Sequence, residues 1–561
     1  MTRTRLRSAL TAALAASLAP ASFAQSDVVS LDPLIEPGLA RIRSGGVDGL
    51  TDGGTIVCYA ADVDGAKLFV RRLSAAGDRL WTEVVPLPAG PLPTIEQSIA
   101  PNGDVFVSAS SFALYEKLVS IDGTTGAVRW NQDLVFPTYS PNSPVVESIA
   151  ATDDGDLLVA SWYPTIVQIQ EEVRFGRFDG TTGAMEWEFS AQTFFQQNTF
   201  EMRASRHGVD LVDSGLVSPP THRALRVGLD GSVVFSSSVP SPGTGPRRLD
   251  TDDAGNLYAD FRNGAYVAFD AAGSPLWSRT YTAFGLPVEM RDVGPAGEII
   301  GIAQAGDAYL ATFEPSGAPR GTSLVNHSAI AVYDVQVADD GGTLVIYDAP
   351  PPALPGSIRA AHFAPQGLRS WENDLGLEAV FTQRGLITSG RNGHVWVAAA
   401  RDSAFGIDPA GYTLKIVPGG DAGVPSCSAT APNSTGVTGR LRAVGSSDAA
   451  TNNLTLLADR LPPLQFVLFL NARTGDTVPN PGGSDGTLCL GGPIARYVRP
   501  GEIRRASPVG LASLELDLTS TPSGVGTTAI LAGDTWHFQA WHRDTTTAGS
   551  NLTGATEVQF D

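Results

Sequence analysis

One string in the chain has the spacing of a serine nucleophile, Gly482-Gly483-Ser484-Asp485-Gly486. A Gly-x-Ser-x-Gly elbow presents its serine for acyl transfer where it joins a strand to a helix. Here the string follows Pro479-Asn480-Pro481 in a stretch without helical periodicity. Gly, Pro, Asn, Asp and Ser are also the usual residues of turns, so we interpret the string as a turn.

Three aspartate-rich strings have the residue types of a calcium site, because hard cations take several carboxylate ligands. They are Asp62-Val63-Asp64-Gly65, Asp153-Asp154-Gly155-Asp156 and Asp250-Thr251-Asp252-Asp253. None of them has the twelve-residue ligand spacing that ends in a glutamate. Asp and Gly also tolerate the backbone geometry of hairpin turns. We favour turns here and keep one structural calcium ion as the alternative.

The seven histidines are scattered, and neither His-Glu-x-x-His nor Cys-x-x-Cys occurs, so the sequence predicts no zinc site. They are His207, His222, His327, His362, His394, His537 and His542. His537 and His542 are five residues apart. An odd separation on a strand places two side chains on opposite faces, so we expect this pair at a surface or an interface.

The fold that must position these residues is indicated by two glycine-centred signals that recur eight times. The first glycine of each pair precedes an apolar run, at Gly54, Gly103, Gly155, Gly208, Gly255, Gly297, Gly342 and Gly393. The second follows at Gly77, Gly126, Gly183, Gly231, Gly273, Gly317, Gly367 and Gly411. Successive copies are about 48 residues apart, close to the length of a four-stranded propeller blade. We therefore predict an all-β fold with an eight-bladed β-propeller at residues 46–420, and an added edge strand as one role for residues 25–45.

The second signal in its fullest form reads Asp-x-x-x-Gly-x-x-x-Trp, as at Asp122, Gly126 and Trp130. This pattern resembles the propeller repeat of pyrroloquinoline-quinone (PQQ) dehydrogenases. The resemblance implies that the tryptophan docks between adjacent blades. Five copies keep it, at Trp81, Trp130, Trp187, Trp277 and Trp371. A platform of flat rings for a carbohydrate stays open for Trp162, Trp396, Trp536 and Trp541.

The dehydrogenases that the repeat resembles hold PQQ in the central channel, against a disulfide between adjacent cysteines and beside a calcium ion and a catalytic aspartate. Cys58 is the only cysteine in residues 46–420, so this chain cannot form that disulfide. We identify no catalytic or cofactor-binding residue and expect no cofactor. The repeat is also similar to that of the lipoprotein subunit of the bacterial outer-membrane barrel-assembly machine, although no cysteine stands near the predicted cleavage site to carry a lipid anchor.

Residues 1–24 have the pattern of a signal peptide. Arg3, Arg5 and Arg7 form a basic start, an apolar stretch follows, and Ser22-Phe23-Ala24 is a small-x-small cleavage site. We expect a secreted or periplasmic protein after cleavage near Ala24. The formal net charge of -20 argues against a nucleic-acid partner, which needs a basic footprint. No later stretch has the length of a membrane helix.

Residues 421–561 differ from the repeats, since short alternating segments are separated by turn residues. This pattern predicts a β-sandwich domain. Leu461-Pro462-Pro463, the string from Leu488 to Pro493, and the aromatic run from Trp536 to Asp544 resemble a C-terminal module of secreted, β-rich bacterial proteins of unknown role.

Cys427 and Cys489 are the only cysteines of this C-terminal region, and an exported chain meets an oxidising compartment. Cys58 lies in the apolar run Thr55-Ile56-Val57-Cys58-Tyr59-Ala60, where its side chain should be buried. We therefore predict a disulfide between Cys427 and Cys489 and an inert thiol at Cys58.

Together these features favour an exported, non-enzymatic binding or scaffold protein whose partner is an unknown protein or carbohydrate. A secreted enzyme, either a PQQ-type oxidoreductase or a hydrolase with a site that the sequence does not reveal, is the alternative. Ligand specificity in a propeller resides in the loops at the mouths of the channel. The candidate loops are Pro137 to Pro144, Gln192 to Glu201 and Ala349 to Gly356.

Overall fold

The computed structural model describes the chain in segments. These are residues 27–33, 41–50, 52–75, 77–111, 115–134, 145–163, 170–194, 200–214, 221–240, 245–283, 285–305, 307–326, 331–338, 341–349, 357–365, 367, 369–378, 382–389, 395–401, 410–417, 422–428, 431–506, 510–545 and 548–561. The predicted signal peptide at residues 1–24 lies outside the described residues.

Within the described part of residues 27–417 the chain forms eight four-stranded antiparallel sheets. In seven of them the strands follow one another in sequence. The first four sheets are β2 (Arg41–Gly49), β3 (Thr55–Asp62), β4 (Ala66–Leu73) and β5 (Arg79–Pro86); β6 (Thr94–Ile99), β7 (Val105–Ser111), β8 (Tyr115–Ile121) and β9 (Val128–Asp133); β10 (Val145–Ala151), β11 (Leu157–Tyr163), β12 (Gln170–Phe178) and β13 (Met185–Phe194); and β14 (Phe200–Ser205), β15 (Gly208–Ser214), β16 (Thr221–Val227) and β17 (Val233–Pro240).

The next three sheets repeat this order. They are β18 (Pro246–Thr251), β19 (Leu257–Phe261), β20 (Ala265–Phe269) and β21 (Pro275–Thr280); β24 (Glu289–Val293), β25 (Ile299–Ala305), β26 (Asp307–Phe313) and β27 (Pro319–Asn326); and β28 (Val332–Val337), β29 (Thr343–Ala349), β30 (Ser357–Phe363) and β31 (Arg369–Glu378). A small hairpin of β22 (Thr282–Ala283) and β23 (Leu286–Pro287) separates the first two of them.

The eighth sheet combines both ends of this region. Its strands are β32 (Thr382–Ser389), β33 (Val395–Arg401), β34 (Ala410–Val417) and β1 (Asp27–Pro33). β1 pairs antiparallel with β34, from Asp27 opposite Val417 to Pro33 opposite Tyr412. Residues 27–33 thus add an outer strand to the last sheet.

The repeat pattern places two features wrongly, one in the last sheet and one in the first sheet. The pattern treats Gly411 as a turn between the third and fourth strands of the last repeat, but Gly411 lies inside β34. The fourth strand comes from residues 27–33, which the repeat period cannot show because they precede the first copy. The first sheet also begins earlier than residue 46, since β2 starts at Arg41.

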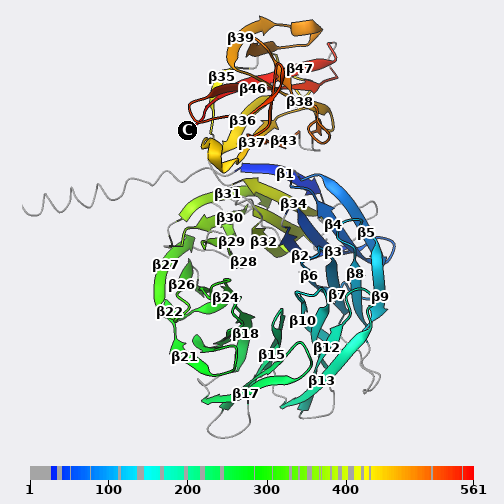
Figure 1. Cartoon of the computed structure of the whole chain (residues 1–561), viewed down its shortest axis with the longest axis vertical. Helices are drawn as coiled ribbons and strands as arrows, with labels where there is room; N and C mark the ends of the chain where they lie inside the picture. Colours follow the sequence, from blue (N-terminus) through cyan, green and yellow to red (C-terminus); the bar gives the residue numbers. More distant parts are fainter. Residues whose placement is uncertain are drawn as a thin grey trace, which may run out of the picture.

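The sheets are arranged around a common axis (Figure 1). The first strand of each sheet contacts the first strand of the next, from β2 and β6 round to β28 and β32, and β2 also contacts β32. Apolar clusters fill the space between neighbours, as where Ile56 and Val70 of the first sheet pack with Val107 and Val119 of the second. The ring is therefore closed, and its all-β arrangement fits a propeller.

Glycine is required at the second signal for two reasons, which Gly126 and Gly183 illustrate. Both have a positive φ, of 77° and 74°, which side chains disfavour. A Cβ atom on Gly126 would also lie 2.8 Å from Trp81, and one on Gly183 would lie 2.9 Å from Trp130. The turn geometry and the close approach of a neighbouring sheet both exclude a larger residue.

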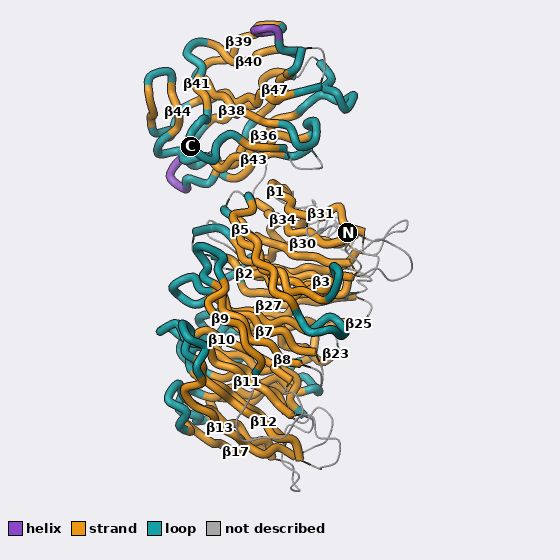
Figure 2. Tube along the Cα trace, turned by 90° about the vertical axis from the view of Figure 1, so that its right-hand side faces the viewer, coloured by secondary structure: helices purple, strands orange, loops and turns teal. Residues whose placement is uncertain are grey.

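The connections of the ring divide between its two faces. In an antiparallel sheet, the turns from first to second strand and from third to fourth lie at one end, and these are the glycine turns. Figure 2 shows most described turns on one side of the ring. The strands that flank Pro137 to Pro144, Gln192 to Glu201 and Ala349 to Gly356 end on the opposite face, and these segments fall largely outside the described residues.

The C-terminal region forms two larger sheets and two hairpins. One sheet contains β35 (Val424–Cys427), β47 (Ser550–Gln559), β46 (Thr535–Arg543), β38 (Phe466–Ala472), β41 (Ala495–Arg496) and β42 (Arg504–Arg505); the other contains β36 (Arg440–Gly445), β37 (Leu454–Asp459) and β43 (Ala512–Glu515). The hairpins are β39 (Thr474–Pro479) with β40 (Thr487–Gly491) and β44 (Thr521–Ser523) with β45 (Gly526–Thr528). Two short 3-10 helices, η3 (Ala449–Thr451) and η4 (Pro481–Gly483), lie in connections.

The two C-terminal sheets share one apolar core. Leu441 and Leu456 of the three-stranded sheet belong to the same buried cluster as Phe469, Phe538 and Val558 of the larger sheet. In the described residues there is no helix with the length and apolar character needed to cross a membrane.

Candidate functional site

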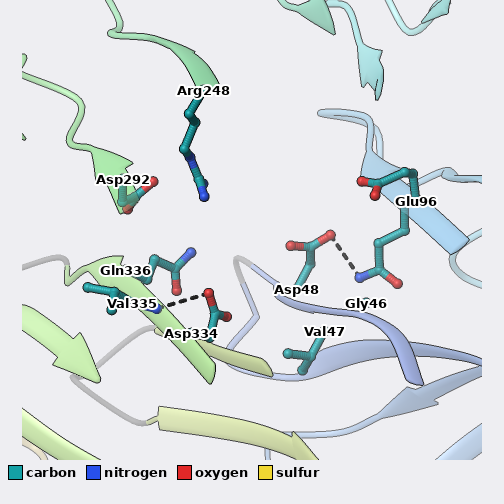
Figure 3. Close-up of a pocket in the computed structure, with 10 residues that line it drawn as sticks. Gly46, Val47, Asp48, Glu96, Arg248, Asp292, Asp334, Val335 and Gln336 are labelled. Atoms are coloured by element: carbon teal, nitrogen blue, oxygen red, sulfur yellow. Dashed lines mark hydrogen bonds between the residues drawn. The ribbon is translucent and has the colours of Figure 1, made fainter. Parts of the chain in front are cut away.

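A polar pocket lies where the first strands of five sheets face the axis of the ring (Figure 3). These strands are β2, β6, β18, β24 and β28, and the cavity has a volume of about 210 Å³. Its lining consists of Gly46, Val47, Asp48, Glu96, Gln97, Arg248, Asp292, Asp334, Val335 and Gln336. Four carboxylates, one guanidinium and two side-chain amides thus meet in one pocket.

A repeated irregularity of the first strands positions several of these side chains. The pairing of β18, β24 and β28 with the second strand of each sheet shifts by one residue directly before Arg248, Asp292 and Asp334. The same shift occurs in β2 before Gly46 and in β10. A bulge of this kind bends a strand and re-aims the residues beside it, and bulges are common next to functional sites.

Hydrogen bonds hold three of the carboxylates in place. The amide of Gln97 donates to Asp48 through Nε2 and Oδ2, at 2.8 Å. The backbone N–H of Val337 donates to Oδ2 of Asp292 at 2.7 Å, and that of Val335 donates to Oδ1 of Asp334 at 2.9 Å. Acceptors that are fixed in this way are arranged before any ligand arrives, which lowers the entropy cost of binding.

Burial changes the protonation of the pocket. It raises the pKa of Asp48, and together with the charge of Asp250 it raises the pKa of Asp292 to about 7. Asp292 therefore keeps its proton to a higher pH than an ordinary aspartate does. Its carboxyl group can accept or donate a hydrogen bond toward a ligand.

A second pair of carboxyl groups lies on the neighbouring first strands β10 and β14. Burial raises the pKa of Glu201 to about 8, and the negative charge of Glu147 adds to this shift. Desolvation by the surrounding protein also raises the pKa of Glu147. Since like charges close together disfavour ionisation, the pair is expected to retain a proton at neutral pH.

This raised pKa predicts a pH dependence of stability. Folded Glu201 keeps its proton up to about pH 8, whereas the unfolded chain loses it near its ordinary value of 4.5. Its contribution to stability is thus present below about pH 4.5 and is lost as the pH rises through about 8. Between pH 5 and 9 the wild type should lose unfolding free energy as Glu201 ionises. In Glu201→Gln we expect this loss to be smaller by at least about 1 kcal/mol. Denaturant titrations at the two pH values measure it.

Glu314→Gln is the matched control for this prediction, because Glu314 forms an exposed ion pair with Arg320 at 2.7 Å. It should leave the pH dependence of the wild type nearly unchanged between pH 5 and 9. If the free energy of unfolding changed by the same amount between pH 5 and 9 in both variants and the wild type, the titration could not be assigned to Glu201.

The tryptophans of the second signal lie between neighbouring sheets. Trp130 donates from Nε1 to the carbonyl oxygen of Gly180 at 2.9 Å, and Trp187 donates to that of Leu229 at 2.7 Å. Each acceptor belongs to a turn of the next sheet. The same bond joins Trp81 to Gly123 at 3.2 Å and Trp277 to Pro315 at 2.9 Å.

The degree of burial differs among these five side chains. Trp130 and Trp371 are 9 % and 3 % exposed, whereas Trp81, Trp187 and Trp277 are half-buried. The repeat pattern predicts that Trp130 and Trp187 are buried between sheets, which is wrong for Trp187 because its ring is half-buried. These residues sit on the outermost strand of a sheet, so part of each ring faces solvent at the rim.

A carbohydrate platform is wrong for two of its four candidate residues. Trp396 is fully buried and Trp536 is 2 % exposed, so neither ring can stack on a ligand. Trp162 packs edge-on against Phe200, and Trp541 donates from Nε1 to Oγ of Ser484 at 3.2 Å. Trp396 instead donates to the carbonyl of Gly53 in the first sheet, at 3.3 Å.

The cysteines are arranged as one pair and one isolated thiol. Cys427 of β35 and Cys489 of β40 form a disulfide whose Cα atoms are 6.1 Å apart. Cys58 of β3 is a buried free thiol, and burial raises its pKa. Because the thiolate is the reactive form, Cys58 is expected to be inert.

Two of the three aspartate-rich strings have structural roles in turns. Asp154 and Asp156 form ion pairs with Arg177 at 2.6 and 2.5 Å. Oδ1 of Asp252 accepts from the backbone N–H groups of Ala254 and Asn256 at 3.0 and 2.8 Å. Across the part of the chain that the structure describes, no group of three or more His, Cys, Asp and Glu side chains is arranged to hold a metal ion.

The expected surface position is wrong for His542, which is fully buried, while His537 is half-buried on the same strand. β46 lies in the middle of its sheet, with β38 and β47 on either side and the shared core against one face. The ring of His222 packs against Phe261 at a tilt of 40°, with ring centres 4.5 Å apart. His327 and His394 fall outside the described residues.

Ser484 follows the short helix η4 in the connection from β39 to β40, so it is not on a strand-to-helix elbow. Its Oγ lies 2.6 Å from Oγ of Ser550. The residue is buried, and its hydrogen bonds tie the connection to β47.

Sequence reasoning missed the axial pocket. Each of its charged residues lies five to eight positions before the first-signal glycine of its repeat, as Asp48 lies before Gly54 and Asp292 before Gly297. A charged residue at this place in several copies is a signal that the pattern contained. The signal was easy to miss because the spacing to the glycine is not constant, at five residues from Asp292 to Gly297 and eight from Asp334 to Gly342.

Comparison with known proteins agrees with this architecture. A family model described as outer membrane protein assembly factor BamB matches residues 66–249. These residues are PQQ-like propeller repeats. The resemblance that the repeat pattern predicted is thereby confirmed, and none of the curated proteins compared with the chain matches it.

Several solved structures resemble the chain at low identity. BamB from Moraxella catarrhalis is 14% identical, with 70% of this chain and 99% of that chain covered and a TM-score of 0.40. The C-terminal WD40 domain of Sif2 is 10% identical, with coverages of 70% and 100% and a TM-score of 0.45. A europium-containing methanol dehydrogenase is 11% identical, with coverages of 69% and 93% and a TM-score of 0.39.

Proposed function

We propose that the eight four-stranded sheets are the blades of one propeller, that the two C-terminal sheets form a β-sandwich, and that the chain is an exported, non-enzymatic scaffold or binding protein for a protein partner. The match of residues 66–249 to a family described as an outer membrane protein assembly factor supports a scaffold role. The basic, apolar and small-residue pattern of residues 1–24 supports export.

The axial pocket is the observation that carries this proposal. It brings the carboxylates of Asp48, Glu96, Asp292 and Asp334 from four sheets to one cavity of about 210 Å³. Charged hydrogen bonds between carboxylates and an ammonium or guanidinium group are stronger than neutral ones. The pocket therefore binds a lysine or arginine side chain that the partner presents to the axis of the ring.

A pull-down with two asparagine variants tests this assignment. Asp334→Asn keeps the shape of a pocket side chain and removes its charge, whereas Asp253→Asn changes an exposed turn residue that pairs with Arg206. The mature wild type should recover a partner from the envelope fraction of the exporting cell, and Asp334→Asn should weaken its binding about tenfold. Asp253→Asn should behave as the wild type.

Equal recovery by both variants would reject the pocket as the binding site. The enzymatic alternative is tested separately by incubating the mature protein with PQQ and calcium and following dye reduction with alcohols and sugars. Cofactor binding with turnover would overturn the non-enzymatic assignment.

A further inference from the structure

The ring is closed by hydrogen bonds inside the eighth sheet. The strands of the other seven sheets follow one another in sequence, whereas in the eighth sheet β34 pairs with β1, from which the chain runs on to β2 of the first sheet. Contacts at this closing junction, where β34 meets β1 and the first sheet, therefore decide whether the ring stays closed.

Cations on the third strand of a sheet also reach across other junctions, as Arg177 and Arg72 show. Arg177 donates from Nη1 to the carbonyl oxygen of Leu229 in the next sheet at 2.9 Å. The charge of Arg177 is balanced within its own sheet by Asp154 and Asp156. Arg72 does the same, bonding Gly123 of the second sheet at 2.5 Å and Asp52 of its own sheet at 2.6 Å.

Lys415 of β34 occupies this place at the closing junction. In the register of the sheet, Lys415 lies opposite Trp396 of the second strand. Arg177 and Arg72 hold the equivalent position in their sheets, opposite Leu158 and Ile56. Its Nζ donates to the carbonyl oxygen of Ala75, in the second glycine turn of the first sheet. The side chain is 2 % exposed, so its charge requires a nearby anion.

The C-terminal region supplies that anion and a second contact. Glu515 of β43 lies 3.2 Å from Nζ of Lys415. Arg504 of β42 forms an ion pair with Asp78, which belongs to the same turn as Ala75. β43 also contacts β1, and Figure 1 shows the C-terminal region beside β1 and β34.

We infer that the C-terminal domain is a clasp for the ring: Glu515 holds the last sheet through Lys415, Arg504 holds the first sheet through Asp78, and the two contacts together keep the closing junction shut. Docking of this domain and closure of the ring then depend on one another. Loss of the clasp opens the junction between β1, β34 and the turn at residues 74–78.

Hydrogen exchange of the full mature chain measures this opening. Glu515→Gln leaves the buried ammonium of Lys415 without its anion, and Arg504→Gln removes the contact to the first sheet. We expect backbone exchange in β1, β34 and residues 74–78 to become about tenfold faster or more in each variant. Glu314→Gln, in an exposed ion pair far along the ring sequence, should leave these segments at the wild-type rate.

The double variant Lys415→Met/Glu515→Gln separates loss of the ion pair from the effect of an unpaired buried charge. The neutral pair leaves no uncompensated charge but also lacks the contact, so exchange in β1 and β34 should stay faster than in the wild type. Wild-type exchange at the closing junction in both single variants would overturn the inference. So would wild-type exchange in the double variant, because the unpaired charge of Lys415 would then explain the effect of Glu515→Gln.

Discussion

Replacing Trp130 by alanine should lower the free energy of unfolding of the ring by about 3–5 kcal/mol, the usual cost of truncating a core aromatic side chain. Its ring is 9 % exposed and packs against Gly183 of the next sheet. The substitution also leaves the carbonyl oxygen of Gly180 without its 2.9 Å hydrogen bond. Urea unfolding followed by intrinsic fluorescence and circular dichroism measures the change.

Trp187→Ala is the matched comparison, since the same hydrogen bond is made at 2.7 Å to Leu229 but the ring is half-buried. Because less apolar surface is lost, the expected cost is smaller, about 2 kcal/mol. Equal costs would mean that burial does not set the contribution of these residues. A stability unchanged by either variant would contradict docking between sheets.

Removing the disulfide should destabilise the C-terminal domain by about 2–4 kcal/mol, because the bond closes a long loop in the unfolded chain. Cys427 and Cys489 are 62 residues apart in sequence and join β35 to β40. Cys427→Ser/Cys489→Ser removes both thiols and avoids a new free cysteine. Thermal unfolding of the oxidised wild type and this variant gives the difference.

Peptide mapping of the non-reduced mature protein is the control for that prediction. It should recover one linked peptide with Cys427 and Cys489 and a separate peptide with reduced Cys58. Free thiols at both C-terminal positions, or a bond that involves Cys58, would contradict the pairing. An identical melting temperature with and without reductant would contradict its energetic role.

The repeat signal was sufficient for the ring because glycine has a strict physical role in it. Gly126 and Gly183 need a positive φ and leave no room for a Cβ atom against the neighbouring tryptophan. Because these constraints act at a single turn, they fix the residue type there, and the sequence shows that residue directly. The PQQ-like repeat type could therefore be predicted from the spacing of the glycines and tryptophans alone.

An edge strand within residues 25–45 could be anticipated, but its pairing partner and the clasp could not be predicted from the repeat. β1 pairs with β34 across nearly the whole length of the ring, and Lys415 meets Glu515 of another domain. Contacts of this kind depend on where distant segments meet in space. A repeat period describes one sheet at a time and carries no information about them.

The axial pocket escaped prediction for a related reason. Arg248, Asp292 and Asp334 are brought to the axis by one-residue shifts in their strands. Such a shift moves a side chain from one face of a strand to the other, so alternation in the sequence no longer gives its direction. The acidic composition indicated the sign of the charge but not its place.

Site-specific photo-crosslinking tests most directly whether the axial pocket binds a partner. A benzophenone amino acid placed at Gln336 in the pocket should form a covalent adduct with one partner protein in the exporting cell, and Asp334→Asn should suppress that adduct. The same probe at Val233, which is 48 % exposed on the outer strand β17, should give no such adduct. Adducts from Val233 alone, or equal adducts with and without the charge of Asp334, would contradict the proposed function.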